Sequence, residues 1–167
     1  MPGLIRCLKE VDHESEAAAT EATFRFNPGE TLSITAGNLI HTDRTWWEHS
    51  GRVEHVTLAR WADLVHIAPA TADSMARAVI GLGGDLNSAT ILGGTKKILW
   101  APAMNPEMWQ SSATKRDVET LKSWRASLRH SGRGAHGLRR GGAEGRAVTE
   151  GAEIAAALEE ASRAGEA

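Results

Sequence analysis

The stretch that decides the fold reads Ala101-Pro102-Ala103-Met104-Asn105-Pro106-Glu107-Met108-Trp109. It follows Lys97-Ile98-Leu99-Trp100, an apolar run that predicts a short buried strand. Two prolines four positions apart exclude a helix across the stretch and favour an extended, turned backbone. We therefore expect Asn105 in a rigid loop just beyond the carboxyl end of a strand, where open α/β sheets bind ligands. Its carboxamide can donate and accept hydrogen bonds there, although an ordinary turn-forming asparagine fits the stretch about equally well.

The segments around this loop alternate between helical patterns and short apolar runs. In order, they predict helix 56–63, strand 64–68, helix 70–81, helix 83–92, strand 97–101 and helix 112–124. Pro69 ends the first strand, and Thr71 or Asp73 is suited to cap the helix that follows. Helices that alternate with strands predict a parallel sheet with crossover helices, hence an α/β fold.

The N-terminal part gives weaker signals. Residues 4–11 have helical spacing, and the Ala/Glu-rich segment 12–23 indicates a helix by propensity alone. After the turn Asn27-Pro28-Gly29, a short helix is predicted over 32–40. The polar segment 41–53, which carries Trp46 and Trp47, is interpreted as an ordered loop.

The C-terminal part begins with a Gly/Arg-rich segment, 125–146, that has few apolar residues and predicts a mobile loop. A basic patch that binds anions is the alternative reading of the same residues. Residues 150–161 predict an Ala/Glu-rich helix.

Composition excludes several classes of function. The chain has 167 residues, enough for one domain with a hydrophobic core, and its net charge of −2 gives no indication of a nucleic-acid or membrane partner. No apolar run approaches the roughly 20 residues that span a bilayer, and the N-terminus has no secretory signal. The single cysteine, Cys7, excludes an internal disulfide and fits a cytoplasmic protein.

Candidate chemical groups gather in three places: Glu54-His55, the segment 69–73, and the segment 102–109. Both strand-end segments have a proline, then small residues, then a polar side chain, which leaves backbone amides accessible to a phosphate or a flat polar ring. His55 is the best candidate for acid–base chemistry, although a lone histidine at a helix start is more often structural. The histidines and the cysteine have no metal-binding spacing, so no metal site is predicted.

Taken together, these motifs resemble the homo-oligomeric flavin-containing cysteine decarboxylases. That family includes phosphopantothenoylcysteine decarboxylase of coenzyme A synthesis and the peptidyl-cysteine decarboxylases of lanthipeptide-type pathways. The resemblance rests on a histidine before an Arg-Trp-Ala-Asp helix, on a Pro-Ala-Thr-Ala-Asp motif, and on Pro-x-Met-Asn-x-x-Met-Trp. In this chain they stand as His55 with Arg60-Trp61-Ala62-Asp63, as Pro69–Asp73, and as Pro102–Trp109.

The resemblance implies a flavodoxin-like (Rossmann-type) parallel sheet flanked by helices in three layers, as a single flavoprotein domain over 1–167. It implies FMN as cofactor, assembly as a homotrimer or homododecamer, and a substrate flap within 125–149. His55 would be the catalytic base, and Asn105 would hold the substrate carboxylate. The implied cofactor contacts are Thr20, Ala70, Thr71, Ala72, Asp73 and Met104, and the implied substrate contacts are Asn105, Met108 and Trp109.

Two departures from the family pattern bear on function. The family begins with a strand and a small-residue loop that holds the FMN phosphate, and this chain starts inside the helix that should follow, so the N-terminal strand is missing or altered. The next family strand aligns with 14–20, where Thr20 keeps the pattern. The coenzyme A enzymes also carry a cysteine on a flap that reduces the enethiol, and the matching segment 137–145 has none.

These departures favour one substrate over another. Without the flap cysteine, the resemblance implies that the C-terminal cysteine of a peptide is decarboxylated to an enethiol. Phosphopantothenoylcysteine is the alternative substrate. A non-catalytic regulatory relative with weak flavin binding is a third reading.

Overall fold

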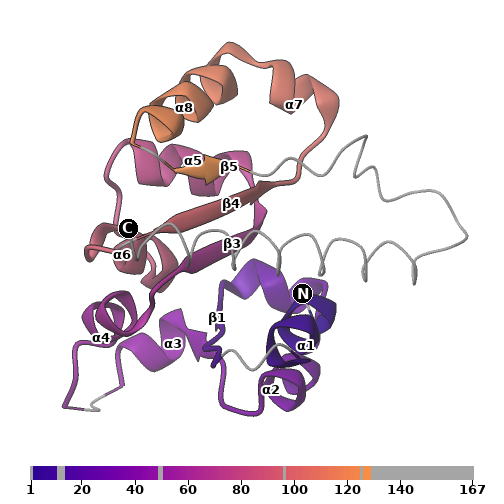
Figure 1. Ribbon diagram of the computed structural model, residues 1–167, viewed down its shortest axis with the longest axis vertical. Helices are drawn as coiled ribbons and strands as arrows, with labels where there is room; N and C mark the ends of the chain where they lie inside the picture. The colour runs from indigo at the N-terminus through magenta and orange to yellow at the C-terminus, as the bar shows by residue number, and fades with distance from the viewer. Residues whose placement is uncertain (1, 11–13, 49–50, 96, 125, 129–167) are drawn as a thin grey trace, which may run out of the picture. The chain divides into compact units, whose positions relative to one another are not determined.

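The computed structural model describes residues 2–10, 14–48, 51–95, 97–124 and 126–128. The chain divides into two compact units, one containing residues up to Thr42 and the other beginning at Asp43 (Figure 1). The single domain expected over 1–167 stays a prediction. The predicted helix 150–161 and most of the predicted flap lie outside the described residues.

The N-terminal unit is built around two helices and a pair of very short strands. Its elements are α1 (Pro2–Glu10), β1 (Ala18–Ala19), the 3-10 helix η1 (Glu21–Arg25), α2 (Gly29–Ala36) and β2 (His41–Thr42). The strands β1 and β2 pair in parallel, and α1 packs against α2. Their small core contains Ile5, Ala19, Leu32, Ala36 and Ile40.

Two expectations for this unit were wrong in part. The helix expected over 12–23 is absent among residues 14–20, because Ala18 and Ala19 pair with the segment at His41 instead, and only Glu21–Thr23 are helical, in η1. The strand that the family alignment placed at 14–20 is present only as Ala18 and Ala19. The helix expected over 32–40 lies three residues earlier and ends at Ala36, because Gly37 turns the backbone into the left-handed region with φ of 76°.

The second unit contains the parallel sheet that the sequence predicts. Its elements are α3 (Asp43–Trp46), α4 (Glu54–Trp61), β3 (Val65–Ala70), α5 (Ala72–Val79), α6 (Leu86–Leu92), β4 (Ile98–Pro102), α7 (Pro106–Gln110), α8 (Ser112–Ser123) and β5 (Ser127–Leu128). The three strands lie in the order β3-β4-β5, and both pairings are parallel. Helix α5 packs against α8, and α4 packs against α6.

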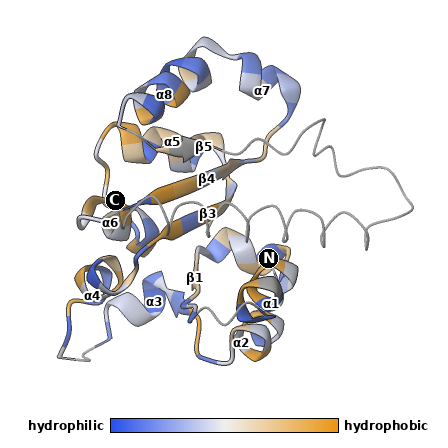
Figure 2. Cartoon of the chain, viewed as in Figure 1, coloured by the Kyte–Doolittle hydropathy of each residue, from blue (hydrophilic) through white to orange (hydrophobic). Residues whose placement is uncertain are grey.

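The core of this unit lies between the sheet and the helices α5 and α8. Trp100 and Met75 are fully buried there, and Val118 and Leu121 of α8 complete the cluster. Apolar residues dominate β4, the central strand (Figure 2). Side chains alternate between the two faces of a strand, and Trp100 faces the core formed with α5 and α8. His66 and its register partner Leu99 therefore face the opposite side of the sheet.

The structure corrects three expectations in this unit. The loop expected over 41–53 contains α3, and the loop expected to begin at 125 includes β5, which pairs with β4. The first strand continues through Pro69 to Ala70 with an irregularity in its register, rather than ending before the proline. The remaining predicted helices and strands are confirmed, with ends that differ by at most three residues.

His66 is the unusual polar residue of the sheet. Both of its ring nitrogens are shielded from solvent and have no hydrogen-bond partner among the described residues. Burial penalises the charged imidazolium and lowers the pKa of His66 from 6.5 to about 4. The ring is therefore neutral in the folded chain at any pH near neutrality.

The buried ring predicts a loss of stability in mild acid. Between pH 6.5 and pH 4 the unfolded chain binds a proton at His66 that the folded chain does not, so the free energy of unfolding falls as the pH falls through this window. At pH 4.5 we expect His66 to account for a loss of about 2.5 kcal/mol relative to pH 7. Urea denaturation at both pH values measures it. His66→Leu should remove this part of the pH dependence, and an unchanged dependence in that variant would contradict the assignment.

Candidate functional site

The carboxyl ends of β3 and β4 bring the two strand-end motifs together. The strands are parallel neighbours, so the loops that follow them leave the same edge of the sheet. The backbone N–H of Ala103 donates to the carbonyl of Ala70 over 3.0 Å and joins the two loops directly. Two of the three predicted clusters therefore form one edge of the second unit, at the place where open α/β sheets bind ligands.

The loop after β3 is fixed by its own side chains. Thr71 is the N-cap of α5, and its hydroxyl oxygen accepts a hydrogen bond from the backbone N–H of Ser74 at 3.2 Å. Ala70 is fully buried, whereas Thr71 and Asp73 are exposed. Small residues and exposed polar groups therefore lie together at this helix start, and the predicted cofactor contacts there stay a prediction.

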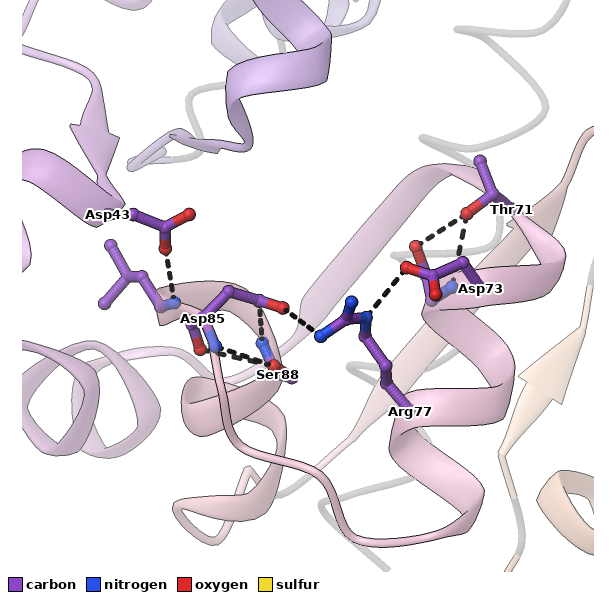
Figure 3. Close-up of polar contacts among 8 residues, drawn as sticks. Asp43, Thr71, Asp73, Arg77, Asp85 and Ser88 are labelled. Atoms are coloured by element: carbon purple, nitrogen blue, oxygen red, sulfur yellow. Dashed lines mark hydrogen bonds and ion pairs between the residues drawn. The ribbon is translucent and has the colours of Figure 1, made fainter.

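Asp73 does not carry an uncompensated charge. Its carboxylate accepts a hydrogen bond from Arg77 Nε at 2.8 Å, and Arg77 also pairs with Asp85 at 3.4 Å (Figure 3). The bond to Asp73, with smaller contributions from Asp85 and Asp43, raises the pKa of Arg77 above its usual value. The guanidinium stays charged and links the start of α5 to the start of α6.

The start of α6 is fixed equally firmly. Asp85 and Ser88 form a capping box, with Asp85 Oδ1 accepting from the Ser88 N–H at 2.8 Å. The next amide, that of Leu86, donates over 2.7 Å to Asp43 Oδ1 of α3. Figure 3 follows these contacts from Thr71 to Asp43. Helix α3 is thereby tied to α6 across a long separation in sequence.

The loop after β4 differs from the expected extended turn. Helix α7 begins inside it, with Pro106 in the first helical position and Asn105 as its N-cap. Asn105 Oδ1 accepts a hydrogen bond from the Met108 N–H at 2.7 Å. Within the described part of the chain, Nδ2 of the same exposed carboxamide makes no hydrogen bond. The cap therefore orients the side chain and leaves its two N–H donors available.

The neighbouring residues supply an apolar surround. Met104 and Trp109 are partly buried and pack against the core under the sheet, while Met108 is 44 % exposed. Asn105 thus lies at the N-cap of α7, and Met108 and Trp109 lie within that helix.

His55 lies near the start of α4 and is partly buried. Its Nδ1 accepts a hydrogen bond from the indole N–H of Trp46 at 3.0 Å, and the two rings meet edge to face. No hydrogen bond joins His55 to the strand-end loops among the described residues. The contact with Trp46 was missed from sequence, where the Trp46-Trp47 pair in a polar segment was the available signal.

Thr20, the predicted cofactor contact of the N-terminal unit, is the N-cap residue of η1 and its hydroxyl lies 3.2 Å from that of Thr23. Among the described residues, no group of three or more acidic, histidine or cysteine side chains could hold a metal ion. In the same part of the chain, no helix has both the length and the apolar character required to cross a bilayer.

The capping role of Asn105 predicts a measurable difference between two substitutions. Asn105→Ala removes the acceptor of the Met108 amide and should lower the free energy of unfolding by about 1 kcal/mol. Asn105→Asp keeps an oxygen acceptor at the helix start and should leave stability nearly unchanged. Chemical denaturation of both variants measures this, and equal destabilisation by Asp and Ala would show that the cap bond is not what holds the loop.

Comparison with known proteins identifies the family of this chain. The model of the Flavoprotein family matches residues 1–133. The coenzyme A biosynthesis bifunctional protein CoaBC of Mycolicibacterium smegmatis is 43 % identical over 119 residues, which are 71 % of this chain and 28 % of that protein. CoaBC of Escherichia coli is 34 % identical over 122 residues, 73 % of this chain and 30 % of that protein. The chain thus spans less than a third of the length of these relatives.

Solved structures extend the comparison. The FMN-dependent cysteine decarboxylase SpaF has a TM-score of 0.75 and 26 % identity, covering 92 % of this chain and 88 % of its own. The FMN-binding protein AtHal3 has a TM-score of 0.76 and 28 % identity, covering 95 % and 89 %. These likenesses confirm the predicted flavodoxin-like α/β fold, and the predicted flavin agrees with the cofactor named for both proteins. On the strength of the family match, this chain belongs to the Flavoprotein family.

Proposed function

We propose that this chain binds FMN and oxidatively decarboxylates the C-terminal cysteine of a peptide, giving an enethiol. The observation that carries the proposal is the state of Asn105. Its Oδ1 is held by the Met108 amide and its Nδ2 is free among the described residues, at the carboxyl end of a strand. A fixed donor pair of this kind suits a carboxylate, which accepts hydrogen bonds through both oxygens. The solved structures of FMN-dependent cysteine decarboxylases support the reaction class.

The loop after β3 fits the flat ring of a flavin. Ala70 and Ala72 are small, so a ring can approach the backbone, and the first amides of α5 at Ala72 and Asp73 make no hydrogen bond within the described residues. The Asp73 carboxylate, although it is paired with Arg77, can accept a further hydrogen bond from a ring N–H. We therefore assign Thr71, Ala72 and Asp73 to the ring, and Thr20 of the N-terminal unit stays a predicted cofactor contact.

When bound, FMN would accept a hydride, a reaction that neither protein side chains nor water can perform. The residues of the chain supply position and charge around it. Asn105 Nδ2 would bind and orient the substrate carboxylate, with Met108 and Trp109 forming an apolar wall beside it. His55 is proposed as the base that receives the proton of the substrate thiol.

The electron balance favours this order of events. Loss of the thiol proton and of a hydride from Cβ converts the cysteine side chain to a thioaldehyde. A thioaldehyde β to the carboxylate can take up the bonding electrons when CO₂ leaves, and the product is an enethiol. Fixing the carboxylate at Asn105 would orient the bond that breaks, which is a contribution of position rather than of new chemistry.

The choice of a peptide substrate rests on a difference in sequence. The segment 137–145 has no cysteine, so the chain lacks the acid that the resemblance assigns to the coenzyme A enzymes for reducing the enethiol. The second candidate, decarboxylation of phosphopantothenoylcysteine, is favoured by the 43 % identity with CoaBC. Assembly from identical subunits and a cytoplasmic location stay predictions.

The mass of the product distinguishes the two candidates. A peptide that ends in cysteine should lose about 46 Da, equivalent to CO₂ and two hydrogens, because the hydride stays with the flavin. His55→Asn should slow this reaction by roughly 100-fold or more, because the group that assists loss of the thiol proton is removed. Mass spectrometry measures both, with flavin absorbance as the control that the variant is loaded. A loss of about 44 Da from phosphopantothenoylcysteine, with no change in the peptide, would reverse the choice of substrate.

The role of Asn105 has a separate test. Asn105→Asp keeps the cap but replaces the N–H donors with a negative charge that repels the substrate carboxylate. We expect KM to rise by roughly tenfold or more, since a charge-assisted hydrogen bond is exchanged for repulsion. Steady-state kinetics on flavin-loaded protein measures it. A KM that stays within twofold of the parent value would remove Asn105 from carboxylate binding.

A further inference from the structure

The ring of His55 is held by its neighbour through a single nitrogen. The indole N–H of Trp46 donates to Nδ1 over 3.0 Å, and the ring centroids lie 5.4 Å apart with the planes at 84°. A ring nitrogen that accepts a hydrogen bond carries no proton, so the neutral imidazole has its proton on Nε2. Nε2 has no hydrogen-bond partner among the described residues, and unlike the nitrogens of His66 it is not shielded from solvent.

The position of Trp46 is itself built into the fold. Asp43, at the start of α3, accepts the Leu86 amide at 2.7 Å, which holds α3 at the start of α6. Thr45 makes a long contact of 3.5 Å with the Glu54 carboxylate, next to His55 on α4. The ring of Trp46 also contacts that of Trp47, a residue that is 74 % exposed, with centroids 4.6 Å apart and the planes tilted by 35°. Trp46 is thus fixed from several directions.

We propose that Trp46 is a positioning residue that keeps the proton of neutral His55 on Nε2, so that the ring meets the substrate as a hydrogen-bond donor. The catalytic meaning of this inference rests on the proposed function. It replaces one step of that function, the transfer of the thiol proton to His55, because the lone pair of the neutral ring is occupied by the indole. His55 then stabilises the substrate thiolate through Nε2–H, and the thiol proton passes to solvent. For His55 to take the proton itself, the indole would first have to leave Nδ1.

The first test observes the tautomer directly and needs no substrate. In the ¹⁵N-labelled 167-residue chain, the His55 nitrogens are identified by the loss of their signals in His55→Asn. In the parent chain Nδ1 should have the shift of an unprotonated, hydrogen-bonded nitrogen, and Nε2 that of a protonated one. Trp46→Phe keeps an aromatic ring but removes the N–H, and should mix the two tautomers. Trp47→Phe is the matched control and should leave the tautomer unchanged. An unchanged tautomer in Trp46→Phe would overturn the proposal.

The second test uses the flavin-loaded protein and the peptide. Trp46→Phe should lower kcat roughly tenfold with little change in KM, because a reacting group loses its orientation. His55→Gln should retain more activity than His55→Asn, since the longer amide can place an N–H donor near the position of Nε2. Equal activity of the Gln and Asn variants, both far below the parent, would favour a base and overturn the donor role.

The two proposals can fail independently. If no cysteine substrate is decarboxylated but Trp46→Phe changes the tautomer, the proposed function fails and the positioning role of Trp46 stands. If His55→Asn abolishes decarboxylation but Trp46→Phe changes neither the tautomer nor kcat, the function stands and the positioning role is overturned.

Discussion

The candidate site depends on the parallel pairing of β3 with β4. The register runs from Val65 opposite Ile98 to Ile67 opposite Trp100, and after an irregularity it closes with Ala70 opposite Pro102. The hydrogen bond from Ala103 to Ala70 continues the pairing beyond the strands. Because the strands are parallel, both loops leave the same edge and each enters a helix. Two short motifs, 36 residues apart at Pro69 and Asn105, become neighbours through this pairing.

The parts of the fold that sequence predicted are those with strong local signals. The runs at 64–68 and 97–101 are apolar, short and followed by proline, and the core that buries Trp100 is what such runs require. The parts that sequence missed are held by distant contacts. Residues 14–19 have helical propensity, yet Ala18 and Ala19 pair with residues around His41. Helix α3 has four residues, too few to be stable alone, and depends on Asp43 reaching the Leu86 amide.

The candidate site shows the same division. The motif residues Thr71, Ala72 and Asp73, and likewise Asn105, Met108 and Trp109, could be selected from sequence because each set lies within one turn of the chain. Even so, the capping role of Asn105 was missed, although an asparagine before a proline is a known signal for a helix start. The contact between Trp46 and His55 had no local signal of that kind. It joins two helices, and its geometry follows from how α3 is anchored.

Asn105 and His55 share one feature. In each side chain, one polar atom makes a hydrogen bond within the fold, and the other polar atom can contact a ligand. Asn105 Oδ1 accepts a hydrogen bond at the start of α7, and His55 Nδ1 accepts one from Trp46, while Asn105 Nδ2 and His55 Nε2 have no partner in the part of the chain that the structure describes. A bond to one end of a small planar group fixes the orientation of the other end, so the free donor needs little ordering when a ligand arrives. The opposite case is His66, whose two nitrogens are both shielded and have no partner within the described ranges, so that its ring lowers stability in acid. A candidate functional group in this chain therefore differs from a buried polar residue in one respect. One of its polar atoms is bonded within the fold and the other is accessible to solvent, a difference that composition alone does not reveal.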